Sequence, residues 1–294
     1  MTEDAAPRYG IDPYLDWVND EGMPVIEGDY AIDLFEVETA PWARIGTNGA
    51  AVHLKGRGDF CNMFLFELAP SGSTAPMRHL YEDIYYVLEG HGSTQIEFSD
   101  GSKQSFEWSP RSMFSIPINM PHRHFNGGGK QRALFVSMTN MPLMMNAFHN
   151  ERFIFDNPFS FIERSGKENY YTGDGDFIPI RPGNHLWETN FVPDMSVIGL
   201  HAYGDRGGGS TNIKFVLADG ILSGHMSEMP VGTYKKGHRN NVRRLASSRA
   251  ATRSNSRIRI LASTGSGSRK CTRPALRPGW KNTSPHKART RYAA

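Results

Sequence analysis

The sequence MRHLYEDIYYVLEGHG at residues 77–92 combines polar side chains with a short apolar run. His79 and Asp83 come just before residues 84–88, which are rich in the β-branched and aromatic residues typical of strands. Tyr85 falls on the same face of such a strand as Asp83, because side chains alternate along a strand. The stretch therefore predicts a β-strand whose entrance carries an imidazole, a carboxylate and a phenol.

A second stretch, IPINMPHRHFN at residues 116–126, complements the first. His122, His124 and Asn126 are two residues apart, so they share one face of a strand. If the two strands are neighbours, up to three imidazoles and one carboxylate can converge in the interior of a sheet structure. Two histidines and one carboxylate form the facial triad that binds Fe(II), and the same donors also suit Mn, Ni or Zn. The predicted metal ligands are His79, Asp83, His122 and His124, with Tyr85 as a predicted substrate contact.

The surrounding sequence predicts an all-β fold. Short runs rich in strand-forming residues recur between turn residues, at 62–68, 84–88, 93–98, 103–108, 113–118 and 133–138, and resume later at 196–201, 213–217 and 221–228. Asp100-Gly101 separates two of them and is a strong hairpin signal. Short strands at this spacing, without helical periodicity between them, favour an antiparallel sandwich or barrel.

Length and composition exclude several classes of protein. The chain has 294 residues, of which 38% are hydrophobic and 11% aromatic, enough for at least one substantial core. The sequence contains no run of 18 apolar residues, so it predicts no transmembrane helix. Its first residues are acidic and polar, unlike a secretory signal peptide. Two cysteines, Cys61 and Cys271, cannot form a disulfide framework. We therefore expect a soluble cytoplasmic protein.

The charge is distributed very unevenly. All 30 Asp and Glu residues lie at or before Glu228, whereas 17 of the 33 Lys and Arg residues follow it, so residues 1–228 carry a net charge of −14. Residues 240–294 contain 14 Lys and Arg, no acid, and mostly Arg, Ser, Ala and Thr. Such a segment can bury little apolar surface, and it is expected to be a disordered basic tail.

A weak internal repeat suggests two similar β-units. Residues 64–72 read as a strand that ends in Pro-x-Gly and is followed by a polar stretch reaching His79. Residues 224–232 have the same pattern and lead to His238. The interpretation divides the chain into an N-terminal arm (1–45) with one short helix near residues 12–19, a complete barrel (46–150), a connector (151–185), the start of a second barrel (186–239) and the basic tail (240–294).

Both informative stretches resemble the sequence motifs of the cupins. The first cupin motif is G-x5-H-x-H-x3,4-E-x6-G; His79 stands in the place of its second histidine, and Asp83 lies seven residues before Gly90. In the second motif, G-x5-P-x-G-x2-H-x3-N, Pro117, His122 and Asn126 match. The resemblance covers roughly residues 50–140 and, weakly, 195–240. The whole chain is similar to a two-barrel cupin, or bicupin, of the gentisate-dioxygenase type.

This sequence also departs from the cupin pattern. Met77 replaces the first histidine, and a thioether is a poor ligand for a hard metal. His124 could supply the missing imidazole or contact substrate instead. Asp83 is shorter than the usual glutamate, and the neighbouring Glu82 would face inward after a shift of one residue in strand pairing.

The resemblance implies a metal-dependent enzyme that acts on a small-molecule substrate. The leading interpretation is an oxidoreductase, an Fe(II) dioxygenase acting on a small aromatic or other organic acid. A redox-neutral metal-dependent isomerase or lyase is one alternative, and a non-catalytic cupin that binds a small molecule is another. The resemblance also leaves open that the protein forms a homo-oligomer, because cupins commonly pair through their sheets and N-terminal arms.

The basic tail allows two further interpretations. Its charge could bind nucleic acid phosphates, but no aromatic interleaving or folded nucleic-acid motif supports such a partner. The alternative is a frameshift just after His238, because the strands and histidines of a second complete barrel are missing there. A frameshift predicts that another reading frame of the gene restores a glycine-rich strand and a second histidine motif.

Overall fold

The structure is a computed structural model that describes residues 12–28, 31–54, 60–161, 168–181, 184–202, 209, 211–218, 222–228, 244–248 and 259–263. His238, Cys271 and most of the basic tail, and with them the expected break after His238, lie outside the described residues. Among the helices that are described, none has the length and apolar character needed to cross a membrane.

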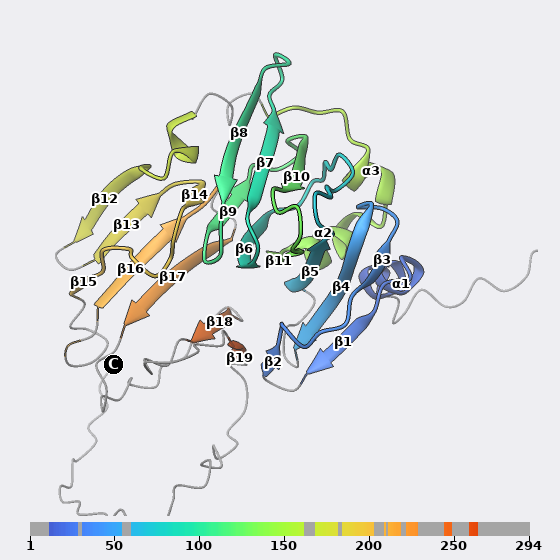
Figure 1. Cartoon of the computed structure of the whole chain (residues 1–294), viewed down its shortest axis with the longest axis horizontal. Helices are drawn as coiled ribbons and strands as arrows, with labels where there is room; N and C mark the ends of the chain where they lie inside the picture. The colour runs from blue at the N-terminus through green and yellow to red at the C-terminus, as the bar shows by residue number, and fades with distance from the viewer. Residues whose placement is uncertain are drawn as a thin grey trace, which may run out of the picture.

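Strands far outnumber helices in this chain (Figure 1). The helices among the described residues are α1 (Pro13–Asp20), α2 (Met141–Phe148), α3 (Glu151–Phe155) and the short 3-10 helix η2 (Glu168–Tyr171). The strands up to the second informative stretch are β1 (Val25–Gly28), β2 (Ala31–Asp33), β3 (Ala40–Trp42), β4 (Thr47–Leu54), β5 (Asn62–Leu68), β6 (Asp83–Glu89), β7 (Gly92–Glu97), β8 (Lys103–Trp108), β9 (Met113–Ile116) and β10 (His122–Asn126). The later strands are β11 (Ala133–Thr139), β12 (Asp176–Arg181), β13 (Asn184–Glu188), β14 (Phe191–Val192), β15 (His201–Ala202), β16 (Thr211–Val216), β17 (Ser223–Glu228), β18 (Arg244–Ser248) and β19 (Arg259–Ser263).

Two sheets build the first barrel. The larger sheet has the order β1-β4-β5-β11-β6-β9-β14, with β3 beside β4, and the smaller sheet has the order β10-β7-β8. Within the larger sheet only β1 and β4 pair in parallel. This arrangement is the all-β jelly-roll barrel that the sequence predicts, so the predicted fold class is confirmed.

The core of the barrel is dominated by aromatic side chains. Strand β8 buries only Phe106 and Trp108 of its six residues, because its other face meets solvent. Strand β5, in contrast, is buried along almost its whole length. Phe66 and Phe135 stack between the sheets with ring centres 5.1 Å apart and an interplanar angle of 12°. β8 is therefore covered on one face only, whereas β5 is covered on both, with Phe64 and Phe66 in the main core and Met63 and Leu65 in a second apolar cluster.

The predicted strands of the first barrel agree closely with the observed ones. Gly101 has a φ of 82° in the β7–β8 hairpin, a conformation that glycine adopts without strain. One predicted strand, at 196–201, is wrong, because regular pairing is present only at His201–Ala202. The carboxylate of Asp194 accepts hydrogen bonds from the backbone N–H and the hydroxyl of Ser196 at 2.7 and 2.6 Å, which holds the chain in a turn instead.

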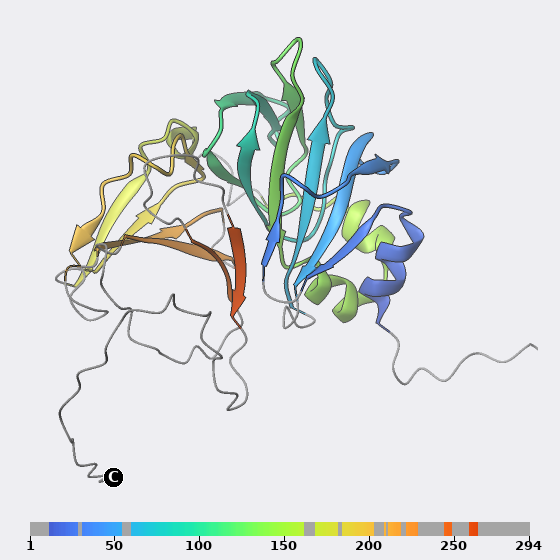
Figure 2. The same cartoon turned by 60° about the horizontal axis from the view of Figure 1, so that its bottom comes forward.

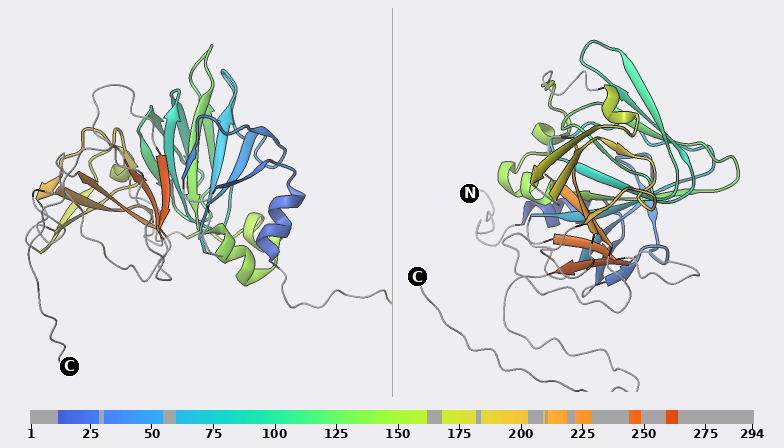
Figure 3. Two further views of the ribbon diagram at one scale, coloured as in Figure 1. Left: turned by 90° about the horizontal axis from the view of Figure 1, so that it is seen from below. Right: turned by 90° about the vertical axis from the view of Figure 1, so that its left-hand side faces the viewer.

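The N-terminal segment adds strands to the barrel. The helix predicted near its start is present as α1, capped by Asp12, whose carboxylate accepts from the Leu15 N–H at 3.1 Å. The remainder of the segment does not form a separate arm, because β1 and β3 both pair with β4. Helices α1, α2 and α3 gather at one end of the barrel, on the side away from β12–β17 (Figures 2 and 3).

A third sheet, of five strands, follows the first barrel in the chain and forms the second unit. Its order is β12-β13-β16-β15, with β17 beside β16, and β12 already begins within the segment expected to be a connector. It attaches to the barrel through β14, which pairs with β9, and through an apolar cluster in which Ile84 and Met113 pack with Ile213 and Phe215. The second unit is therefore a sheet packed on the first barrel.

Two short strands differ from the expectation of a disordered tail. β18 and β19 pair with each other in antiparallel register, and β19 continues onto β2 (Figure 2). The expectation rested on the shortage of apolar residues in the tail. Pairing along a strand edge uses backbone hydrogen bonds, which do not depend on apolar side chains.

Candidate functional site

The predicted site residues lie where two strands of facing sheets begin. Asp83 is the first residue of β6 and His122 is the first residue of β10, while His79 lies in the segment that leads into β6. Asp83 and His122 are each 3% exposed and His79 is 6% exposed. The sandwich of the two sheets thus brings together polar groups that are 39 residues apart in the sequence, from Asp83 to His122.

Strand β10 confirms the predicted alternation. His122, His124 and Asn126 are buried, and Arg123 and Phe125 between them are only half-buried. The shared face does not give the three residues one role. The Asn126 amide donates to the backbone carbonyls of neighbouring turns at 2.8 to 3.2 Å and accepts from the Gly128 N–H, so Asn126 organises the end of the strand.

Four side chains form a continuous polar network in the barrel. His79 Nε2 lies 3.5 Å from Asp83 Oδ2, and the Tyr85 hydroxyl donates to the same oxygen at 3.1 Å. The Tyr85 hydroxyl also lies 3.4 Å from His122 Nε2. Tyr85, predicted to contact substrate, therefore stands between the carboxylate and the second imidazole.

The protein backbone fixes the tautomers of two imidazoles. His79 Nδ1 is 3.0 Å from the carbonyl oxygen of Tyr81, and His122 Nδ1 is 2.9 Å from the carbonyl oxygen of Met120. A carbonyl can only accept, so each Nδ1 carries the proton and each Nε2 presents a lone pair to the network. This is the tautomer in which a histidine binds a metal through Nε2.

His124 is held by a different kind of group. Its Nδ1 is 2.8 Å from the hydroxyl oxygen of Thr94, which in turn accepts from the indole N–H of Trp108 at 3.0 Å. Its other nitrogen, Nε2, is buried and has no hydrogen-bond partner. The ring centre of His124 is 5.3 Å from that of His122 and 4.9 Å from that of Tyr85.

Burial determines the protonation of these groups. It lowers the pKa of His79 to about 3, with a smaller contribution from nearby His122, and it lowers the pKa of His122 to about 4. Burial likewise holds the pKa of His124 well below its usual value. It raises the pKa of Asp83 to about 7, against the opposing effect of neighbouring hydroxyl groups. The imidazoles are therefore neutral at pH 7, as metal ligands must be.

We expect the metal-free protein to lose stability as the pH falls from about 6.5 towards 4. In this window an unfolded histidine, with a pKa of about 6.5, binds a proton that folded His79 and His122 do not bind. Asp83 acts in the opposite direction, because its folded pKa of about 7 lies above the unfolded value. His124 adds to the destabilisation, because burial lowers its pKa as well. Each net proton lowers the free energy of unfolding by about 1.4 kcal/mol per pH unit.

Urea unfolding between pH 7.5 and 4.5 measures this slope. The double variant His79→Gln, His122→Gln should show a shallower dependence on pH than the parent protein. Equal slopes would mean that the two imidazoles do not control the acid sensitivity.

The structure resolves the two alternatives at the first motif. Asp83 faces the imidazoles, whereas the side chain of Glu82, fully buried, accepts a hydrogen bond from the backbone N–H of Leu222 at 2.5 Å. Glu82 thus ties the start of β6 to the residue that precedes β17. Met77 pairs through its backbone with His122 and packs its side chain against the main core, so the position of the missing histidine has a packing role.

The donor set fits a divalent metal in its chemistry. Two imidazoles bound to one ion at about 2.0–2.1 Å have ring centres roughly 4.5–5.5 Å apart for bond angles of about 90–110°. The ring centres of His79 and His122 are 5.3 Å apart, and Asp83 Oδ1 is a buried oxygen without a hydrogen-bond partner. In the described part of the chain, however, no three His, Cys, Asp or Glu side chains already stand as a metal-binding group. The Tyr85 hydroxyl lies between Asp83 and His122 instead.

Sequence reasoning missed the residues that support the site. The Tyr81 ring stacks on His79 with ring centres 3.8 Å apart, and Phe155 of α3 contacts Tyr81 edge-on at 6.0 Å. Thr94 and Trp108 hold His124 from the smaller sheet. No motif marks these residues. The contact of Thr94 with His124 depends on strand register, which places the two residues opposite each other, and the contact of Phe155 depends on how α3 packs.

Comparisons with known proteins agree with the barrel. Residues 64–139 match the family model of the cupin domain, Cupin_2, which supports the cupin superfamily. A stretch of 85 residues is 32% identical to auxin-binding protein T92 of Nicotiana tabacum, covering 27% of this chain and 46% of that protein. The chain thus spans about half the length of this curated relative.

Solved structures with some likeness are distant. A mutant oxalate decarboxylase of Bacillus subtilis is 12% identical, with a TM-score of 0.31, over 38% of this chain and 29% of that chain. Vicilin from Solanum lycopersicum is 16% identical, with a TM-score of 0.33, over 38% of this chain and 32% of that chain.

Proposed function

We propose that the first barrel is a metal-dependent cupin enzyme, an Fe(II) dioxygenase acting on a small aromatic or other organic acid. His79, Asp83 and His122 would hold the metal. One observation carries this proposal. Backbone carbonyls fix the imidazoles of His79 and His122, and the Nε2 atoms of both face one polar network that contains the buried carboxylate of Asp83. The match of residues 64–139 to the cupin domain supports it.

The chain's own residues prepare this site for such chemistry. The Tyr81 and Met120 carbonyls keep the lone pairs of His79 and His122 available, so no proton has to leave either imidazole. When bound, the metal would orient oxygen and substrate together and stabilise developing negative charge. Tyr85 can donate its proton at the hydroxyl oxygen to Asp83 Oδ2 or to a substrate oxygen in the same place. The Tyr81 ring, which stacks on His79 and is contacted edge-on by Phe155, shields the His79 side of the site from water.

Oxygen consumption tests the proposal directly. Protein loaded anaerobically with Fe(II) would be mixed with hydroxylated benzoic acids in an oxygen-electrode cell. We expect uptake that requires both the iron and one acid, and that disappears in a His79→Ala, His122→Ala variant. Stoichiometric iron without oxygen uptake, across a broad set of organic acids, would remove the dioxygenase assignment and favour an isomerase or lyase.

One observation favours a second candidate, a non-catalytic barrel that binds a small acid without metal. The Tyr85 hydroxyl already bridges Asp83 and His122, and the partly matching tobacco protein is named for binding auxin. Equilibrium dialysis of indole-3-acetate with chelator-treated protein distinguishes the two. Binding that is undiminished by chelator supports this candidate, and binding that appears only with metal excludes it.

A further inference from the structure

Within the imidazole cluster, His124 is the member whose proton position is not set by a backbone carbonyl. Its Nδ1 faces the Thr94 hydroxyl at 2.8 Å, and a hydroxyl can either donate or accept. The other contact of that hydroxyl therefore decides the direction of the hydrogen bond. Both side chains are completely buried, so solvent offers no alternative partner.

The second contact of Thr94 removes the ambiguity. The indole N–H of Trp108 can only donate, and it donates to Thr94 Oγ1 at 3.0 Å. The Thr94 hydroxyl proton then has one acceptor among its described contacts, which is His124 Nδ1. If His124 donated instead, the Thr94 proton would be left buried and unpaired, an arrangement that folded proteins avoid. The relay thus runs from Trp108 through Thr94 to His124 Nδ1.

This direction places the remaining proton of His124 on Nε2. That atom is buried without a partner, and the rings packed against the His124 ring, those of Tyr85, Phe114 and Phe135, offer at most weak π acceptors. An imidazole nitrogen that carries a proton has no free lone pair with which to bind a metal. It can donate to an oxygen atom that enters the barrel beside His122, whose ring centre is 5.3 Å away.

We infer that His124 is a specificity-determining hydrogen-bond donor, which presents Nε2–H to an oxygen of a small acid anion bound beside His122. The inference rests on the proposed function and deepens it, because it assigns His79, Asp83 and His122 to the metal and His124 to the substrate anion. A buried, preorganised donor favours an anionic oxygen over an apolar group of the same size.

The tautomers of the metal-free full chain test the assignment without any substrate. Nitrogen-15 NMR separates a protonated from a bare imidazole nitrogen. We expect His124 to be protonated at Nε2, with signals that vanish in His124→Gln and change in Thr94→Val, and His79 and His122 to be protonated at Nδ1. A fourth buried histidine, His53, is identified by the loss of its signals in His53→Gln. A His124 signal protonated at Nδ1 would overturn the inference.

Metal content separates this inference from the proposed function. With Mn(II) as the probe, His124→Gln and His124→Leu should bind within about twofold of the parent protein, since His124 is not a ligand in this assignment. A loss of tenfold or more in both, in protein that melts like the parent, makes His124 a ligand and overturns the inference while the metal site stands. If the parent protein binds no Mn(II) or Fe(II), the proposed function fails, and the NMR result still decides the tautomer.

Formate, the smallest carboxylate, tests the anion. Its titration should shift the Nε2–H proton of His124. Its affinity should fall on the order of tenfold to a hundredfold in His124→Leu relative to His124→Gln, whose amide can still donate, since this is the range of a hydrogen bond to a charged group. The absence of both effects would overturn the anion assignment.

Discussion

Replacing His79 and His122 together by alanine should abolish metal binding. The parent protein is expected to carry about one iron or manganese ion per chain, and the double variant none, because two of the three protein ligands of the facial triad would be gone. Elemental analysis of the purified proteins measures this difference. We expect this loss because His79 and His122 are held in the tautomer that binds metals, with their Nε2 lone pairs facing the polar network of Asp83 and Tyr85.

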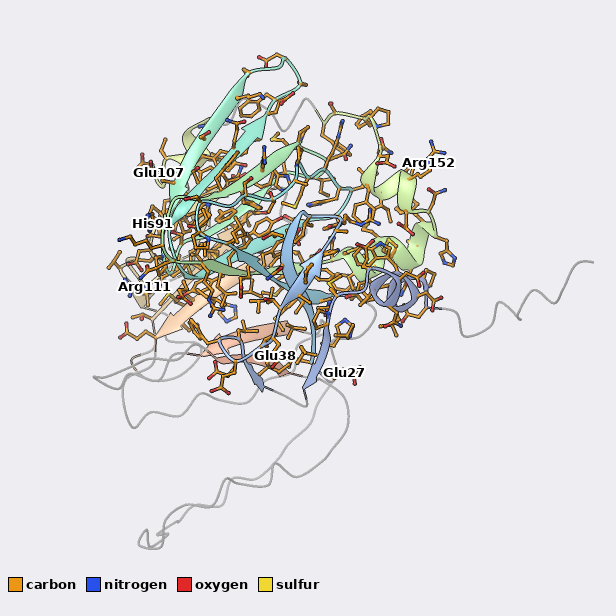
Figure 4. All side chains as sticks on the ribbon, turned by 45° about the vertical axis from the view of Figure 1, so that its right-hand side comes forward. Glu27, Glu38, His91, Glu107, Arg111 and Arg152 are labelled. Atoms are coloured by element: carbon orange, nitrogen blue, oxygen red, sulfur yellow. The ribbon has the colours of Figure 1, made fainter. Side chains whose placement is uncertain are left out.

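A matched control is available on the surface. His91 is exposed, and it lies at the opposite side of the view from Arg152 of α3 in Figure 4. His91→Ala should retain the metal fully. Metal-free parent protein that is shown to be folded would contradict the expectation and leave the barrel as a binding module without metal.

Phe135→Ala should destabilise the barrel strongly. Its side chain is completely buried, stacks on Phe66 at 5.1 Å, and meets the rings of Trp108 and His124 at 5.8 and 5.1 Å. Removing it opens a cavity between the two sheets that rigid aromatic neighbours cannot fill. We expect the free energy of unfolding to fall by about 3–5 kcal/mol. Urea unfolding at pH 7.5 measures it.

Phe159→Ala is the control for this substitution. Phe159 is 57% exposed, and the same chemical change there should alter the free energy of unfolding by no more than about 0.5 kcal/mol. A small effect at Phe135 would mean that the core between the sheets relaxes around the lost ring. The site would then depend less on the packing that surrounds His124.

The sequence predicted the first barrel well and its surroundings poorly. Strands such as Asn62–Leu68 and Lys103–Trp108 were predicted to their ends, because β-forming runs bounded by turn residues depend on local conformational preferences. The strand predicted at 196–201 failed because Asp194 forms a local turn there. β1 and β3 were missed because a short strand depends on the edge that receives it, in this case β4.

The amino-acid sequence by itself determined the all-β architecture, the candidate site residues His79, Asp83 and His122, and the shared face of His122 and His124. Spacing along a strand sets which face a side chain occupies, so these features need no distant contact. Only the tertiary structure decided that Asp83 faces inward, that Glu82 accepts a hydrogen bond from Leu222, and that Thr94 holds His124. These depend on the register and packing of segments far apart in the chain, which local sequence does not encode.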